Sequence, residues 1–151
     1  MTLLQLGLRF TVYDVIYFNR DTIKLNEPIR GYVELRSKPS KEYPIRLRAF
    51  IARQEKNYNY DFSNEKKVEL DTFYDLSIDT INKKWFKGVE PESLVVIGQY
   101  FDSIGDKTIR GYYQQYSYGP FKKMENGNKI DSVIGYKTYF EKKIYVKDSL
   151  E

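Results

Sequence analysis

Residues 68–79 read VELDTFYDLSID, and apolar and polar side chains alternate along this stretch. A period of two places alternate side chains on opposite faces of a β-strand. The set expected on the buried face comprises Val68, Leu70, Thr72, Tyr74, Leu76 and Ile78. Such alternation is typical of an antiparallel sheet with one face in the core and the other in water.

The same period recurs along much of the chain, at residues 4–12, 29–35, 45–51 and 134–146. Strand-like sequence also covers 108–118, polar loops interrupt the pattern, and Asn126-Gly127 is typical of a tight hairpin turn. The chain shows no internal repeat or low-complexity linker, so residues 1–151 are expected to form one domain. About seven or eight strands predict an all-β fold, an antiparallel β-sandwich, with a closed barrel as the alternative.

The expected core consists of apolar side chains at alternate positions of the predicted strands. It comprises Leu6, Leu8, Phe10, Val33, Leu35, Leu47, Ile51, Leu70, Leu76, Tyr136 and Phe140. Residues 91–104 differ, because their large apolar side chains recur at helical spacing after Pro91, which suits a first helical turn. We therefore predict one short helix at 91–104.

The composition excludes several classes of chemistry. Among 151 residues there is no cysteine and no histidine. Disulfide scaffolds, thiol nucleophiles, zinc ribbons, histidine metal sites and Ser-His-Asp triads are therefore excluded. Aromatic residues make up 17%, with 15 tyrosines, which is unlike the composition of a disordered chain. The composition indicates a folded, non-catalytic domain without a cofactor.

The net charge of +4 is spread evenly, with +2 on each half of the chain. Such a surplus permits an acidic partner without requiring one. The N-terminal sequence MTLLQLGLRF lacks a basic region and a small-residue cleavage site, and the longest aliphatic run, residues 94–97, is too short to span a bilayer. We expect a cytoplasmic protein, and the abundance of Ile, Lys, Glu and Tyr would suit a hot-living, for example archaeal, source.

Residues 18–54 read FNRDTIKLNEPIRGYVELRSKPSKEYPIRLRAFIARQ. An aromatic strand leads through a short turn into an I-x-G-x-V-x-L strand at 29–35, and a basic–apolar strand follows a polar loop at 45–51. This stretch resembles the opening of an arrestin-like domain, the immunoglobulin-like sandwich shared by arrestins, a retromer subunit and a bacterial sporulation-control protein. Residues 134–140 are similar to a late strand of that family.

The resemblance implies a non-enzymatic adaptor or scaffold that binds other proteins. The Pro-Gly-acidic sequence that usually precedes the I-x-G strand is here Leu25-Asn26-Glu27-Pro28. The chain has room for one sandwich, whereas arrestins pair two, so a switch at an interface between two domains is not implied.

Carboxylates are the remaining candidates for acid–base chemistry. Asp71, Asp75 and Asp79 share one strand face with Glu69. We interpret them as a solvated face that discourages edge-to-edge aggregation. Composition does not exclude a glycosidase-like carboxylate pair, whereas a calcium loop with a turn-forming glycine and the glycine-rich nucleotide motifs are missing.

Residues 110–123, RGYYQQYSYGPFKK, combine tyrosines with basic side chains. The candidate partner-binding residues are Arg110, Tyr112, Tyr116, Tyr118 and Phe121. Three interpretations remain open: core tyrosines, a protein-binding hot spot, or a surface that stacks single-stranded nucleic acid. Residues 112–118 carry no charge and are rich in β-formers, so we expect an edge strand that binds a protein partner or a second copy. A coat-like assembly subunit is a further alternative.

Overall fold

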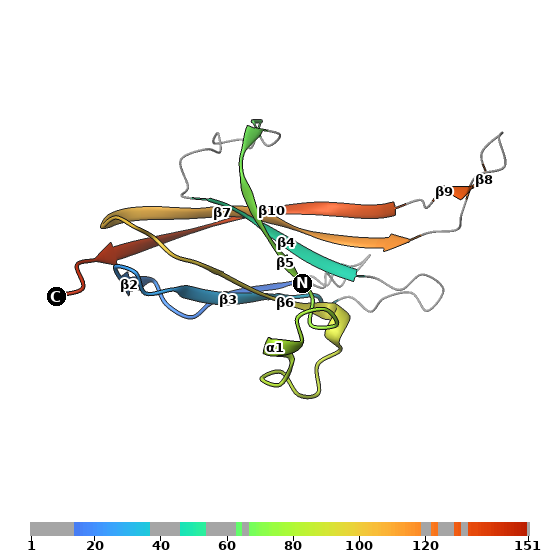
Figure 1. Ribbon diagram of the computed structural model, residues 1–151, viewed down its shortest axis with the longest axis horizontal. Helices are drawn as coiled ribbons and strands as arrows, with labels where there is room; N and C mark the ends of the chain where they lie inside the picture. The colour runs from blue at the N-terminus through green and yellow to red at the C-terminus, as the bar shows by residue number, and fades with distance from the viewer. Residues whose placement is uncertain are drawn as a thin grey trace, which may run out of the picture.

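The structure is a computed structural model that describes residues 14–36, 46–53, 63–64, 67–118, 122–123, 129–130 and 133–150. Residues 117–118, 122–123, 129–130 and 133–136 are described by their backbone alone. Within these ranges, eight strands form two sheets, which Figure 1 shows as two layers. The predicted all-β sandwich is confirmed.

The first sheet has three antiparallel strands in the order β1-β3-β6: β1 (Val15–Phe18), β3 (Ile29–Glu34) and β6 (Leu94–Gln99). The second has five in the order β2-β10-β7-β4-β5: β2 (Thr22–Lys24), β10 (Val133–Lys147), β7 (Gly105–Tyr118), β4 (Arg46–Ala52) and β5 (Leu70–Tyr74). Only β2 and β10 run parallel within these described sheets. Three short elements complete the description: β8 (Lys122–Lys123), which pairs with β9 (Lys129–Ile130); α1 (Thr80–Lys83); and the 3-10 turn η2 (Pro91–Ser93).

The core lies between the two sheets, where the alternating strands turn their apolar sides toward each other. In β4 the buried positions alternate with half-buried Arg46, Arg48 and Phe50. Of the expected core, the buried residues are Val33, Leu35, Leu47, Ile51, Leu76 and Phe140. Leu70 is half-buried, and Leu6, Leu8, Phe10 and the side chain of Tyr136 lie outside the described residues.

The structure corrects the prediction of which side chains of residues 68–79 are buried. Phe73 packs against the core, whereas Thr72 and Tyr74, which were expected inside, are exposed. Asp75 was expected on a solvated face but is fully buried. Alternation separates the two faces of a strand, but it does not say which face turns inward when a carboxylate finds buried partners.

The predicted helix at 91–104 is also corrected. Residues Pro91–Ser93 form only one 3-10 turn, and β6 follows immediately. The strand is largely buried and rich in β-branched side chains, so it suits a sheet better than a helix. The helix α1 was not predicted; it is only four residues long and is capped by Asp79, whose carboxylate accepts the backbone N–H of Asn82 at 3.2 Å.

Two glycines allow neighbouring strands to approach closely. A Cβ on Gly31 would lie 2.0 Å from the carbonyl oxygen of Tyr17 in β1, and one on Gly111 would lie 2.0 Å from that of Phe50 in β4. No side chain fits at such distances without moving the backbone. The glycine of the I-x-G-x-V-x-L stretch is thus required by the packing of β1 on β3.

Asp75, the residue after β5, connects that strand to β4 through its carboxylate and to β6 through its backbone. Its Oδ2 accepts hydrogen bonds from Arg46 Nε at 3.0 Å and from the backbone N–H of Leu47 at 3.1 Å. Its Oδ1 accepts the backbone N–H of Ser77 at 3.0 Å. The residue also forms an isolated antiparallel bridge with Val95 of β6. One buried residue therefore joins the end of β5 to β4 through its side chain and to the opposite sheet through its backbone.

Burial by itself raises the pKa of Asp75. The hydrogen bonds from Arg46, Ser77 and the Leu47 N–H outweigh that effect, so the pKa lies below its ordinary value. A carboxyl group whose pKa is lower in the folded state stabilises the fold above its unfolded pKa of about 4. That contribution is lost as the pH falls through the folded pKa.

We predict that Asp75→Asn lowers the free energy of unfolding at pH 7 by about 3 kcal/mol, because the amide leaves the buried donors poorly paired. The difference between wild type and variant should begin to shrink below about pH 4, where the unfolded carboxyl group protonates, and should continue to shrink until the pH has passed the lower folded-state pKa. Urea denaturation at pH 7 and from pH 4 to 2 measures both effects. Equal stability at pH 7, or a difference that does not shrink in acid, would contradict the assignment.

Tyr113 makes a second buried polar contact. Its side chain is 4% exposed, and its hydroxyl donates to Asp14 Oδ2 at 2.7 Å. Burial is the main reason that its pKa rises to about 12, and the hydrogen bond to Asp14 adds to it. A raised folded-state pKa stabilises the fold below the unfolded pKa of about 10. The stabilisation then disappears between pH 10 and 12 as the unfolded chain ionises first.

Tyr113→Phe should therefore cost about 1 kcal/mol at pH 8 and progressively less as the pH approaches 12. The comparison with wild type cancels the titration of the other tyrosines. Denaturation curves at intervals from pH 8 to 12 give the difference. If the difference in the free energy of unfolding between the two proteins stays constant across this pH range, the hydroxyl of Tyr113 is not a buried donor.

Candidate functional site

The sequence-predicted residues lie on the central strand β7. Arg110, Tyr112 and Tyr116 share one parity, and Tyr113 has the other and packs in the core. The period of two along a strand accounts for this separation of Tyr112 and Tyr116 from Tyr113. Tyr118 ends β7, but its side chain is not among those described, and Phe121 lies outside the described residues.

Residues 112–118 were expected to form an edge strand. This expectation is wrong for residues 112–116, which lie between β10 and β4. Tyr112 pairs with Tyr139 of β10 on one side and with Phe50 of β4 on the other. Tyr116 likewise pairs with both strands. The ladders on both sides use the backbone N–H and C=O groups of this segment. Uncharged, β-forming residues suit a central strand as well as an edge strand. The composition of the segment therefore does not distinguish the two positions.

The cross-strand register assembles a layer of side chains on the outer face of the five-stranded sheet. One row runs Phe50–Tyr112–Tyr139, and the next runs Arg48–Gln114–Lys137. Arg110 stands opposite Glu141. We call this surface the tyrosine face, and its residues are Arg48, Phe50, Arg110, Tyr112, Gln114, Tyr116, Lys137, Tyr139 and Glu141.

Aromatic rings and cations contact one another across these rows. The ring of Phe50 stacks on that of Tyr112 with centroids 4.7 Å apart, and Tyr112 contacts Tyr139 at 5.5 Å. The guanidinium of Arg48 lies 4.6 Å from the ring centre of Tyr116, and the ammonium of Lys137 lies 4.8 Å from that of Tyr112. Such cation–π contacts hold the cations close to the sheet.

Tyr112 and Tyr116 form the base of the face, whereas Tyr139 lies at its outer surface. Tyr112 and Tyr116 are each only 6% exposed, whereas Tyr139 is 41% exposed. An approaching molecule would therefore meet Arg48, Lys137 and Tyr139 first. The basic–apolar alternation of residues 45–51 does not connect Arg48 with residues 110–118, because that connection depends on the register between strands.

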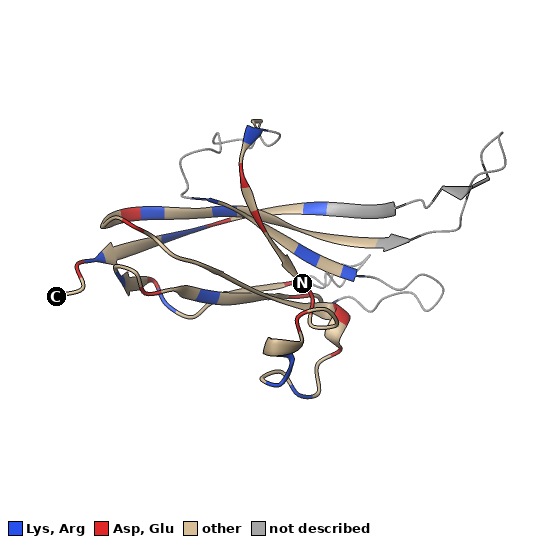
Figure 2. Cartoon of the chain, viewed as in Figure 1, with Lys and Arg blue, Asp and Glu red and all other residues tan. Residues whose placement is uncertain are grey.

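The face carries more positive than negative charge. Figure 2 shows basic residues distributed along β4, β7 and β10. Arg110 pairs with Glu141 at 3.0 Å, which neutralises one cation. Arg48 donates two hydrogen bonds to the uncharged Oε1 of Gln114, at 2.9 and 2.8 Å, so its charge is held in place without being cancelled. The surface suits a partner with acidic groups.

Among the described residues, no group of acidic side chains could hold a metal ion. In the same part of the chain, no helix has the length and apolar character needed to cross a membrane. No protein-family model matches the chain, and no curated protein matches it significantly in sequence.

Arg48 should be the side chain that orders this face. Replacing it with lysine, Arg48→Lys, keeps the charge but loses the planar group that spans Tyr116 and Gln114. We expect the free energy of unfolding to fall by about 1 kcal/mol, measured by urea denaturation. Arg53→Lys, at an exposed arginine just beyond the same strand, is the control and should leave stability unchanged. Equal effects of the two substitutions would show that Arg48 does not order the face.

Proposed function

We propose that this chain is a non-catalytic protein-interaction module, and that the tyrosine face is its partner-binding surface. The observation that carries the proposal is the position of Arg48 and Lys137 above nearly buried tyrosine rings. These contacts hold charged and aromatic groups in fixed positions on a rigid sheet, so little conformational entropy is lost on binding. Tyrosine and arginine are also the residue types that dominate binding hot spots.

A non-catalytic role is supported by the state of the buried carboxylate. Asp75 is held by several donors and has a lowered pKa, which suits a structural ion pair better than proton transfer near neutral pH. The sequence contains no histidine or cysteine to share such work. The arrestin-like pattern of residues 18–54 points to the same class, an adaptor or scaffold.

Burial favours a protein over single-stranded nucleic acid as the partner. Bases stack on exposed ring faces, as in sheet platforms that bind single strands. Here Tyr112 and Tyr116 are only 6% exposed, and cations lie over both rings. The charge of Arg48, which its hydrogen bonds to Gln114 do not neutralise, can attract acidic side chains of a protein.

The test compares two exposed positions with two matched positions further along β10. Lys137→Glu and Tyr139→Ser change the tyrosine face, and Lys143→Glu and Tyr145→Ser repeat the changes nearer the end of the strand. Tyr139 and Tyr145 are 41% and 43% exposed, so the paired substitutions remove comparable surface. We expect the first pair to weaken binding of a purified, captured partner by about tenfold or more and the second pair to leave it unchanged.

Isothermal titration calorimetry measures the affinities, and sedimentation velocity shows whether the partner is a second copy. Equal effects at the two sites would overturn the assignment of the surface. Binding of a labelled oligo-dT that weakens steeply with salt and requires Lys137 would replace the protein partner with nucleic acid.

A further inference from the structure

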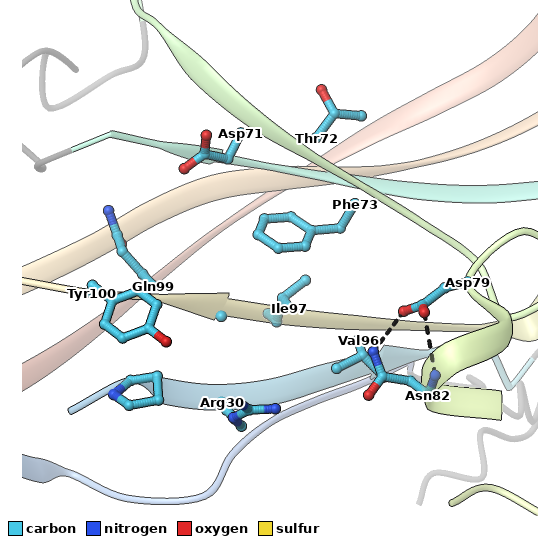
Figure 3. A pocket seen from close by; sticks show the side chains of 12 residues that line it. Arg30, Asp71, Thr72, Phe73, Asp79, Asn82, Val96, Ile97, Gln99 and Tyr100 are labelled. Atoms are coloured by element: carbon cyan, nitrogen blue, oxygen red, sulfur yellow. Dashed lines mark hydrogen bonds between the residues drawn. The ribbon is translucent and has the colours of Figure 1, made fainter. Parts of the chain in front are cut away.

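A cleft lies between β5 and β6, the edge strands of the two sheets on one side of the described sandwich. Its volume is about 480 Å³, within the range typical of ligand sites. Figure 3 shows residues of both edge strands facing the cleft, with Arg30 of β3 on one side and the Asp79–Asn82 pair at one end. The bridge between Asp75 and Val95 joins the two strands, and the cleft begins beyond that bridge.

The backbone of β6 turns polar groups toward this cleft. In an antiparallel ladder, alternate residues bond to the partner strand and the others point away. Leu35 N–H donates to the Ser93 carbonyl at 2.8 Å, which fixes Ser93 and the odd-numbered residues of β6 as those that face β3. Val96 and Gly98 therefore direct their backbone groups outward, and Gly98 has no side chain to cover them.

The same reasoning applies to β5 on the opposite wall. Arg53 N–H donates to the Glu69 carbonyl at 3.0 Å, and Asp75 N–H to the Leu47 carbonyl at 3.2 Å. The odd-numbered residues of β5 thus face β4, and Thr72 directs its backbone groups away from that strand. Two strand edges with outward N–H and C=O groups line one cleft.

Gln99 contributes a buried acceptor beside the cleft. The residue is 8% exposed, and its Nε2 donates to the Ala52 carbonyl at 2.9 Å, across to the other sheet. Its Oε1 is buried and accepts no hydrogen bond from the described residues. A buried oxygen without a donor costs about 1–3 kcal/mol. A ligand that supplies an N–H or O–H would remove that cost.

The charged side chains around the cleft differ in the partners that they have. Asp71 is paired with Arg53 at 2.7 Å, and Asp79 accepts the side-chain amide of Asn82 at 2.7 Å. Arg30 is exposed and uses its backbone N–H to bond Asn19, and no described carboxylate pairs with its guanidinium. Asp79 keeps its negative charge, because the amide of Asn82 is neutral. An acidic group on the ligand is therefore favoured beside Arg30 and disfavoured at the end of the cleft with Asp79.

We propose that this cleft binds an extended peptide of a partner protein, which adds as a further strand along the edge of β6. Its backbone pairs with Val96 and Gly98. Alternate side chains of an added strand point to opposite faces. One set lies on the outer side, where an acidic residue meets Arg30, and the other enters between the sheets, where an apolar residue packs on Phe73 and Ile97.

An extended peptide fits these features because the two walls present backbone groups in the repeat of a β-strand. The occupant also supplies the donor for Gln99 Oε1, from a hydroxyl or amide side chain or from its backbone. The proposal concerns a surface separate from the tyrosine face, so each can fail without the other.

The probe is a displayed library of random decapeptides selected on the intact protein. We expect enriched sequences that place an acidic residue next to an apolar one. A synthetic peptide of the selected sequence should bind Arg30→Glu at least tenfold more weakly than wild type, and exchanging its acidic residue for lysine should restore binding to that variant. Lys143→Glu makes the same change of charge on an exposed part of β10 and should have no effect.

Amide hydrogen exchange locates the peptide independently of affinity. The bound peptide should slow exchange at Gly98, whose N–H points into the cleft, and leave exchange on β10 unchanged. Lys137→Glu and Tyr139→Ser should not affect peptide binding. The proposal is overturned if no peptide is enriched, if binding is indifferent to Arg30, or if Gly98 is not protected. Protection of Gly98 in a dimer without peptide would assign the cleft to a second copy instead.

Discussion

The buried carboxylate of Asp75 is the constraint on which the arrangement of the two sheets depends. A charge removed from water must be matched by donors, and here Arg46, Leu47 and Ser77 supply them. Because those donors come from β4 and from the turn after β5, the match is possible only when β5 is correctly registered on β4. The bridge to Val95 then fixes the second sheet against the first. The same bridge lies at one end of the cleft between β5 and β6.

Much of the fold could be predicted because burial in a sandwich imposes a period of two. The strands at 29–35 and 45–51 have the expected inner residues, including Val33, Leu47 and Ile51. β6 was mistaken for a helix because apolar residues in a largely buried strand also satisfy a helical spacing. The inward turn of Phe73 and Asp75 could not be predicted, since it depends on an arginine 29 residues earlier in the chain.

Three residues of the tyrosine face were proposed from the sequence, but their setting could not be. Arg110, Tyr112 and Tyr116 do share a face, yet their neighbours Arg48, Lys137 and Tyr139 come from strands whose pairing no local pattern reveals. The cleft was missed for the same reason, because β3, β5, β6 and α1 each contribute a few ordinary residues to it. Only the topology shows that the backbones of Gly98 and Thr72 face the same cleft.

The parallel pairing of β2 with β10 has a consequence for the order of folding. Thr22 lies beside Tyr145, so β2 pairs with a strand that is far from it in the sequence. Contacts between distant segments form slowly, because a long loop must close before they stabilise anything. In the five-stranded sheet as described, β2 is held only by β10, and β7 has β10 as one of its two neighbours. The sheet is therefore completed only when β10 is in place, and closure of the long loop between β2 and β10 is expected to be a late step of folding.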